Sequence, residues 1–344
     1  ASRRFPPQPE LRSMIRGSAS AALTPALAAA LAGLAYAAAA VVTCALTPLA
    51  RRFAVRSGAM DQPNERKIHK HPLPTSGGIA IIAGFLVAAW AAGAVHHMRP
   101  QAFLAIIGGG LCVALVGFID DRRDLPAKLK LLLQIISALP LLLAGLTISV
   151  VSRPFQHGTM VFLPPWLAGV VTVLWVVAVT NAINLIDGLD GLAAGVSAIS
   201  CVALALIALA WGQVGVAVLC AALAGAAVGF LPWNWHPSSI IMGDTGAYFL
   251  GYMIASVTIL GAFKMAAAIA IFVPILVLAV PLLDTVLSPV RRFLSGRPAF
   301  AADRDHLHHR LVAMGLSEPR VVLLTYAVTA VCGAIAIWIS RKGG

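Results

Sequence analysis

The sequence contains few charged residues, and this scarcity sets the class of protein. Only 11% of the 344 residues are Asp, Glu, Lys or Arg, whereas 60% are hydrophobic. Soluble domains carry about 25% charged residues, so the composition argues strongly against a soluble fold. The mean hydropathy of +0.90 and several apolar runs long enough to cross a bilayer predict an all-α, polytopic integral membrane protein.

Paired cysteines and two common catalytic signatures are also missing. The five cysteines stand singly in apolar runs without a CxxC pair, which is typical of buried packing residues. There is no GxxxxGK[ST] loop, which argues against a P-loop NTPase, and no GxSxG elbow. The net charge is +12. In a membrane protein such an excess marks cytoplasmic loops rather than a nucleic-acid site.

The apolar runs account for about ten spans of roughly 20 residues each. They lie at 22–47, 77–95, 101–119, 129–147, 165–183, 191–210, 213–231, 245–262, 265–288 and 321–340. Lys and Arg concentrate in the loops 48–76, 120–130 and 289–320, which predicts that these loops are cytoplasmic. The β-branched loop 148–164 predicts a short external hairpin.

The domain organisation expected from this pattern is simple. Residues 1–20 are predicted to be a flexible tail, and residues 21–344 a single transmembrane catalytic domain. The tail is basic, yet an even number of spans would place it outside, so its side of the membrane is left open.

Most of the acidic residues fall at the cytoplasmic ends of the predicted spans. A charge near mid-bilayer costs several kcal/mol and usually marks an ion path. Within the predicted spans, Asp284 is the acid that breaks this pattern. The distribution therefore favours an active site at the cytoplasmic membrane face. A transporter for an anionic lipid is the non-enzyme alternative.

The densest polar pattern is Asn-Ala-Ile-Asn-Leu-Ile-Asp-Gly-Leu-Asp-Gly-Leu at 181–192. Asn181, Asn184, Asp187 and Asp190 are spaced by three, so a helix or a 3₁₀ turn would bring them to one face. Carboxylate and amide oxygens suit Mg²⁺, which also binds substrate phosphates. The alternative is a polar turn in which these residues only cap helices.

A second acidic pair, Asp120 and Asp121, ends the third predicted span. Adjacent carboxylates repel each other, which a cation would relieve, and either could be a general base. Lys128 and Lys130 open the next span and could hold a phosphate as point charges. Helix capping and membrane-flanking lysines are the alternative explanation.

Two further segments carry polar side chains at predicted cytoplasmic positions. Asp244 lies between glycines at the start of the eighth span, where it is either a metal ligand beside a helix N-terminus or a helix cap. The loop 303–310 reads Asp-Arg-Asp-His-Leu-His-His-Arg. His and Arg donors suit phosphate, whereas zinc is less expected because no cysteine or HExxH pattern accompanies them. A solvated basic loop is the alternative.

Carboxylates combined with basic residues at a membrane surface indicate Mg²⁺ and phosphate chemistry. Such a site fits one water-soluble and one lipid substrate. The simplest reaction is transfer of a phosphoryl-linked group onto a lipid phosphate.

In their order and spacing, these motifs resemble the polyprenyl-phosphate N-acetylhexosamine-1-phosphate transferase family over roughly residues 22–340. The His-Leu-His-His-Arg run at 306–310 is similar to the GlcNAc-1-phosphate branch, and the phospho-MurNAc-pentapeptide branch is an alternative. A CDP-alcohol phosphatidyltransferase is a second alternative, but its DGxxAR…GxxxDxxxD pattern is missing.

The resemblance implies a reaction at the start of cell-envelope polysaccharide synthesis. GlcNAc-1-phosphate would pass from UDP-GlcNAc to undecaprenyl or decaprenyl phosphate, giving polyprenyl-pyrophosphoryl-GlcNAc and UMP. The implied cofactor is Mg²⁺, which Mn²⁺ could replace. The implied surroundings are the lipids of the inner or plasma membrane, without nucleic acid, and a homodimer is among the assemblies to test.

The resemblance also implies roles for single residues. Asp244 would be the main Mg²⁺ ligand, with Asn184 and Asp187 beside it. Asp120 or Asp121 would deprotonate or orient the lipid phosphate, and Asp187 belongs to the same catalytic set. Lys130 or Lys128 would hold that phosphate. The residues implied on the nucleotide and sugar side are Asp190, Asn234, His306, His308, His309 and Arg310.

Overall fold

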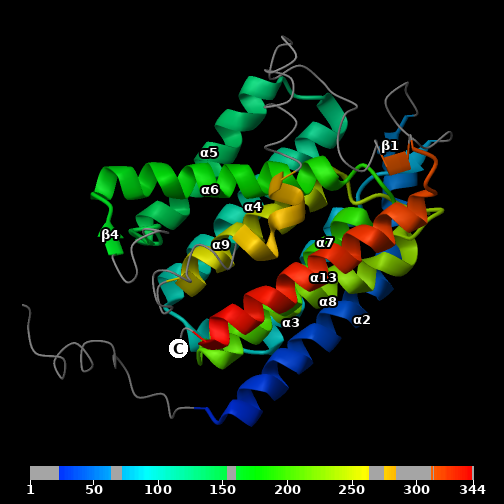
Figure 1. Cartoon of the computed structure of the whole chain (residues 1–344). Helices are drawn as coiled ribbons and strands as arrows, with labels where there is room; N and C mark the ends of the chain where they lie inside the picture. The colour runs from blue at the N-terminus through cyan, green and yellow to red at the C-terminus, as the bar shows by residue number, and fades with distance from the viewer. Residues whose placement is uncertain are drawn as a thin grey trace, which may run out of the picture.

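The computed structural model of the chain describes residues 23–62, 72–152, 160–262, 275–283, 311–312 and 314–342. The predicted tail at 1–20 and most of the predicted span at 265–288 lie outside these residues. Figure 1 shows the long helices, which are α2 (Pro25–Ser57), α3 (Gly77–Ala91), α4 (Pro100–Arg123), α5 (Ala127–Leu143), α6 (Pro165–Ile186), α7 (Leu192–Ala210), α8 (Val214–Asn234), α9 (Gly243–Ala262) and α13 (Glu318–Lys342).

Among the described residues, six helices are long and apolar enough to cross a membrane: α2, α4, α6, α7, α8 and α13. Helix α3 is shorter but also apolar. The predicted all-α, polytopic membrane class is therefore confirmed. The count of about ten spans stays a prediction.

Helix α2 begins at a capped N-terminus and is longer than the hydrocarbon layer of a membrane is thick. The hydroxyl of Thr24 accepts a hydrogen bond from the N–H of Leu27 at 3.3 Å, and Pro25 follows where a missing N–H costs nothing. The helix continues for 33 residues, about 50 Å at 1.5 Å per residue. Because the hydrocarbon layer is about 30 Å thick, the helix extends beyond the predicted span end at residue 47 and carries Arg51 and Arg52 with it.

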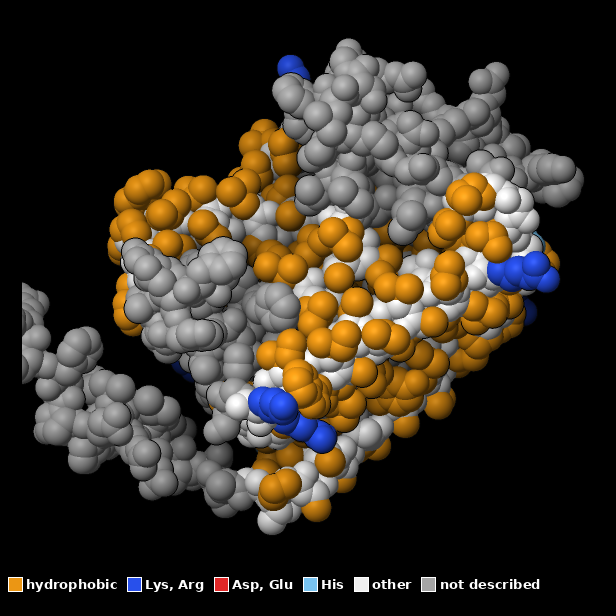
Figure 2. Space-filling view, in the orientation of Figure 1, with side chains coloured by type: hydrophobic (Ala, Val, Ile, Leu, Met, Phe, Trp, Pro, Cys, Tyr) orange, Lys and Arg blue, Asp and Glu red, His pale blue; other side chains and the backbone are white. Residues whose placement is uncertain are grey.

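Helix α8 is the most buried of these segments and packs against α2 through glycines. A β-carbon at Gly225 would lie 2.1 Å from the carbonyl oxygen of Tyr36, and one at Gly229 would lie 2.2 Å from that of Ala40. Only hydrogen side chains allow the two backbones to approach this closely, as is usual where membrane helices lack a hydrophobic driving force between them. In Figure 2 the described part of the visible face is largely apolar. Leu323, Val331 and Trp338 of α13 are among the exposed large hydrophobic residues.

Short strands mark the two ends of the bundle. The predicted hairpin at 148–164 is confirmed, because β3 (Val150–Ser152) pairs antiparallel with β4 (Met160–Phe162), with Val151 opposite Val161. A second pair was not predicted: β1 (Met60–Asp61) lies antiparallel to β2 (Leu73–Pro74). In Figure 1, β4 lies beside the start of α6, and β1 lies toward the opposite end of the helices.

The backbone just before α9 is held by the start of α3. The N–H groups of Gly77 and Gly78 donate to the carbonyl oxygens of Ile241 and Met242 at 3.1 and 3.0 Å. A β-carbon at Gly78 would lie 2.3 Å from the backbone nitrogen of Gly246. The two consecutive glycines therefore let α3 and α9 begin side by side, which fixes where Asp244 enters the bundle.

Candidate active site

The two adjacent aspartates at the end of α4 point to different partners. The carboxylate of Asp121 accepts hydrogen bonds from the N–H of Asp244 (2.8 Å), the N–H of Thr245 (3.2 Å) and the Thr245 hydroxyl (2.7 Å). The two N–H groups are among the first amides of α9, which a helix leaves without internal partners. Asp121, which belongs to α4, thus caps the N-terminus of α9. Asp244 lies inside α9, so the alternative role of Asp244 as the helix cap is not the one the structure shows.

Close backbone contact supports this capping arrangement. A β-carbon at Gly117, one helical turn before Asp121, would lie 2.4 Å from the carbonyl oxygen of Asp244. Gly243 takes a left-handed conformation with φ of 70°, which glycine adopts without strain. A β-carbon at Gly246, on the other side of Asp244, would lie 2.8 Å from the Cα of Gly78, so the fold requires both glycines that flank Asp244.

Asp120 is buried, with 5% of its surface exposed, and it faces Lys130. Its Oδ1 accepts from the N–H of Leu125 at 2.8 Å, while its Oδ2 lies 2.7 Å from Lys130 Nζ and accepts from the Tyr248 hydroxyl at 3.3 Å. The carboxyl group of Asp120 also contacts that of Asp244. Lys130 thus belongs to the acidic site, whereas Lys128 is exposed.

The end of α6 brings an amide and a further acid to Asp244. Asn184 Nδ2 donates to Asp244 Oδ1 at 2.7 Å, and Asp187 follows as the residue that ends the helix. Most of Asp187 is removed from solvent, and this burial, together with the nearby carboxylates of Asp244 and Asp121, raises the pKa of Asp187 well above its usual range. We call Asp120, Asp121, Asn184, Asp187 and Asp244 the acidic cluster.

The four polar residues spaced by three do not share one set of partners. Asn181 turns away from the acidic cluster to Gln134 on α5, to which it donates at 2.6 Å. Asn184 contacts Asp244, whereas Asp190 lies next to His236. The spacing placed the residues at one end of α6, but the neighbouring helices decide which partner each side chain meets.

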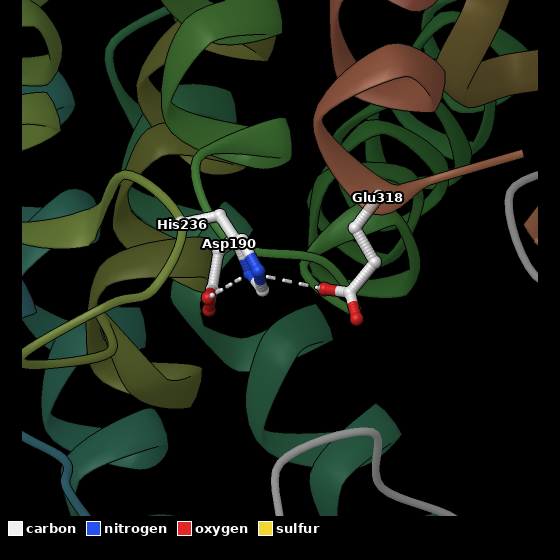
Figure 3. Close-up of side chains that lie close together, drawn as sticks. All are labelled: Asp190, His236 and Glu318. Carbon is white, nitrogen blue, oxygen red and sulfur yellow. Dashed lines mark hydrogen bonds and ion pairs between the residues drawn. The ribbon is translucent and has the colours of Figure 1, made fainter.

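Figure 3 shows a second polar group, in which the ring of His236 lies between two carboxyl groups. His236 Nδ1 is 3.1 Å from Asp190 Oδ2 and 3.4 Å from Glu318 Oε2. We call these three residues the histidine group. Sequence reasoning assigned no role to His236 or Glu318, although Glu318 opens the last span much as Asp244 opens the eighth.

The resemblance implies that Asn234 contacts the nucleotide, but in this structure its side chain makes hydrogen bonds to two backbone groups. It is buried, its Oδ1 accepts from the N–H of Gly191 at 3.0 Å, and its Nδ2 donates to the carbonyl oxygen of Ile240 at 3.1 Å. The side chain thereby joins the turn before α7 to the segment before α9. Its contact with a nucleotide stays a prediction. The predicted site residues His306, His308, His309 and Arg310 lie outside the described residues.

The donors of the acidic cluster fit a hard divalent cation. Carboxylates of Asp120 and Asp244 that face each other carry an excess of negative charge, which a cation relieves. Mg²⁺ needs only one or two protein carboxylates because waters and substrate phosphates complete its shell. Among the His, Cys, Asp and Glu side chains of the described residues, the histidine group brings three ligand atoms within 4.8 Å of one another; in the acidic cluster the amide of Asn184 would have to contribute.

Comparison with known proteins identifies the class to which this site belongs. Residues 103–262, which include α4 with its two aspartates and α9 with Asp244, match the model of glycosyl transferase family 4. The chain is also similar over most of its length to several named members of that class.

Three relatives define the branch. The chain is 39% identical over 302 residues to a probable undecaprenyl-phosphate N-acetylglucosaminyl 1-phosphate transferase of Bacillus subtilis, covering 86% of this chain and 83% of the relative. It is 36% identical over 317 residues to a decaprenyl-phosphate N-acetylglucosaminephosphotransferase of Mycobacterium tuberculosis, covering 84% and 77%. It is 30% identical over 291 residues to an undecaprenyl-phosphate alpha-N-acetylglucosaminyl 1-phosphate transferase of Salmonella typhi, covering 83% and 78%. The chain belongs to this family of polyprenyl-phosphate N-acetylglucosaminyl 1-phosphate transferases.

Proposed function

We propose that the protein transfers GlcNAc-1-phosphate from UDP-GlcNAc to undecaprenyl or decaprenyl phosphate and releases UMP. The observation that carries this proposal is the convergence of Asp120, Asn184 and Asp244, from three helices, beside Lys130. Acidic and basic groups gathered at the end of membrane-crossing helices suit a lipid phosphate and a soluble nucleotide-sugar. The names of the relatives support the acceptor and the sugar.

The proposed step is a single displacement at phosphorus. An oxygen of the lipid phosphate forms a bond to the β-phosphorus of UDP-GlcNAc, and the bond from that phosphorus to the bridging oxygen breaks, so that the oxygen leaves with UMP. A bound Mg²⁺, held by Asp244 with Asn184 and Asp187, would neutralise charge on the pyrophosphate. Mn²⁺ has similar preferences for oxygen ligands and could replace it.

We assign Lys130 to the lipid phosphate and Asp120 to its orientation or deprotonation. An ammonium group has three donors, and the 2.7 Å contact with Asp120 uses one of them. The exposed carboxylate of Asp124 lies 3.8 Å from the same Nζ, beyond hydrogen-bond distance, so among the described residues two donors stay available for the phosphate, and Asp120 keeps the ammonium group in place. Asp121 is a poorer candidate for the base, since three hydrogen bonds from α9 already use its two oxygens.

We further propose that the site faces the cytoplasm of an inner or plasma membrane. The segment 120–130, rich in Lys and Arg, itself carries Asp120 and Asp121 of the acidic cluster and Lys130 beside it, as a positively charged cytoplasmic loop would. Arg51, at the end of α2, donates to the carbonyl oxygen of Ser239 at 3.2 Å. The proposed contacts of His306, His308, His309 and Arg310 with the sugar-pyrophosphate belong to the same reaction.

The test is release of UMP by the purified full-length protein in detergent. UDP-GlcNAc with polyprenyl phosphate and Mg²⁺ should give UMP and a lipid-linked sugar, and omission of either the lipid or the metal should stop the reaction. UDP-MurNAc-pentapeptide and a CDP-alcohol pair are the comparison donors. Turnover with either of these, and not with UDP-GlcNAc, would refute the proposed substrate.

A further inference from the structure

The histidine group lies beside the acidic cluster but makes none of its contacts. Asp190 stands three residues after Asp187, on the turn between α6 and α7, whereas Glu318 opens α13. His236 lies on the segment that joins α8 to α9, and its side chain is 39% exposed. Three segments far apart in the sequence therefore meet at one imidazole ring (Figure 3).

The contacts of Asp190 are concentrated on one of its two oxygens. Oδ2 receives the N–H of Ser238 at 3.0 Å and lies 3.1 Å from His236 Nδ1. Within the described residues these contacts leave Oδ1 as the oxygen available to a ligand. An aspartate held by one oxygen presents the other in a fixed direction, which is how supporting residues preorganise a binding group.

Glu318 faces the same ring nitrogen of His236 as Asp190 does. Its Oε2 is 3.4 Å from the same Nδ1, so a proton on that nitrogen is attracted by two carboxylates. The neighbouring contacts hold the same region: Tyr326 on α13 donates to the carbonyl oxygen of Gly191, and its ring lies 6.3 Å from that of Trp235. Helix α13 is thus joined to the turn that carries Asp190 directly through Gly191 and indirectly through His236.

We infer that His236 and Glu318 are positioning residues that hold Asp190 for the nucleotide half of the donor substrate. This inference rests on the proposed function and on the contact with the nucleotide that the family resemblance implies for Asp190. Hydrogen bonding explains the geometry better than a shared metal ion, since the Asp190 oxygen nearest the ring already accepts a backbone N–H. The arrangement couples donor binding to α13, the helix that follows the basic loop 303–310.

The experiment measures kcat and the KM of each substrate in the full-length enzyme. His236→Ala should raise the KM for UDP-GlcNAc about tenfold, as expected for one lost hydrogen bond to a charged group. kcat and the KM for polyprenyl phosphate should change less than about twofold. His236→Asn, whose amide nitrogen can occupy the place of Nδ1, should restore most of the affinity. His96→Gln, on an exposed histidine outside this group, is the control and should behave as wild type.

Two further variants test the link through Glu318. Glu318→Gln should raise the same KM about threefold, and the double variant with His236→Ala should be no worse than His236→Ala alone, because coupled contacts are not additive. Binding of UMP to the detergent-solubilised protein should weaken in the same order.

Unchanged UMP binding in both His236→Ala and Glu318→Gln, or equal defects in His236→Asn and His236→Ala, would overturn the inference. Failure of the wild type to accept UDP-GlcNAc while it still binds UMP would refute the proposed donor, and the order of UMP affinities would still decide the role of His236.

Discussion

The acidic cluster and the histidine group lie at the same end of the bundle, yet they are built in different ways. The acidic cluster uses the ends of α4, α6 and α9, and Asp120 is only 5% exposed. The histidine group uses a turn, a connecting segment and the first residue of α13, and the side chain of His236 is 39% exposed. Buried carboxylates on rigid helix ends suit binding of a metal ion and stabilisation of charge during the reaction, because electrostatic interactions are strong where water is excluded.

The difference also separates two kinds of defect. Loss of a group from the acidic cluster should lower kcat, since its members would act on the reacting phosphates. Loss of a group from the histidine group should weaken binding of the donor. Five substitutions in and around the acidic cluster would break or sharpen this comparison, and they follow from the largest expected effect to the smallest.

Asp244→Ala should give the largest effect. It removes the carboxylate that Asn184 and Asp120 contact, and we expect kcat to fall by about 10³-fold or more, as for other groups that stabilise charge in a transition state. UMP release measures the activity, and circular dichroism with a thermal melt checks the fold. Retained activity in a folded variant would remove Asp244 from the metal site.

Asp120→Asn and Asp121→Asn should separate two neighbouring residues. Asp120→Asn removes the partner of Lys130, and we expect kcat to fall about 10²-fold, within the range for loss of an acid–base group. Asp121→Asn keeps an acceptor for the amides of α9 but loses a negative charge there, which should cost about 1 kcal/mol of stability and only a few-fold in kcat. A reversed order of the two kcat values would assign the base to Asp121.

Gly117→Ala should disturb Asp244 from outside the cluster. Its new β-carbon would lie 2.4 Å from the carbonyl oxygen of Asp244, so α9 must shift, at a cost of about 1–3 kcal/mol. We expect kcat to fall at least about tenfold, because misplacement of about 1 Å is costly in catalysis. Gly108→Ala is the matched control on the same helix, since nothing lies within 4 Å of its β-carbon. Equal activity of the two variants would show that the α4–α9 contact tolerates change.

Asp187→Asn comes last because its test is the stability of the metal-free protein, where we expect a smaller effect than the losses in kcat above but an informative pH dependence. The pKa of Asp187 is raised by burial and by its acidic neighbours, so this residue stabilises the metal-free protein at low pH. That contribution is lost as the pH rises above about 4 and passes through the raised pKa. In EDTA, the melting temperature of wild type should therefore fall with rising pH more steeply than that of Asp187→Asn. Parallel curves for the two proteins would contradict this account, and added Mg²⁺ should stabilise wild type most.

Much of the site could be located from the sequence, but not its internal contacts. The positions of Asp120, Asp187 and Asp244 at span ends follow from hydrophobicity, because charged groups avoid the bilayer core. The partners do not follow from spacing: Asn181 meets Gln134, Asn184 meets Asp244, and Asp190 meets His236. Sequence periodicity describes one helix at a time, whereas each of these contacts joins two segments.

The sequence by itself determined that the chain is helical, lies in a membrane and carries most of its acids at the ends of the predicted spans, since the cost of placing each residue in lipid is a local property. Only the tertiary structure decided that Asp121 caps α9 while Asp120 pairs with Lys130. Adjacent residues point in different directions from a helix and so meet different neighbours. The same holds for His236, because its contacts with Asp190 and Glu318 join residues that lie far apart in the sequence.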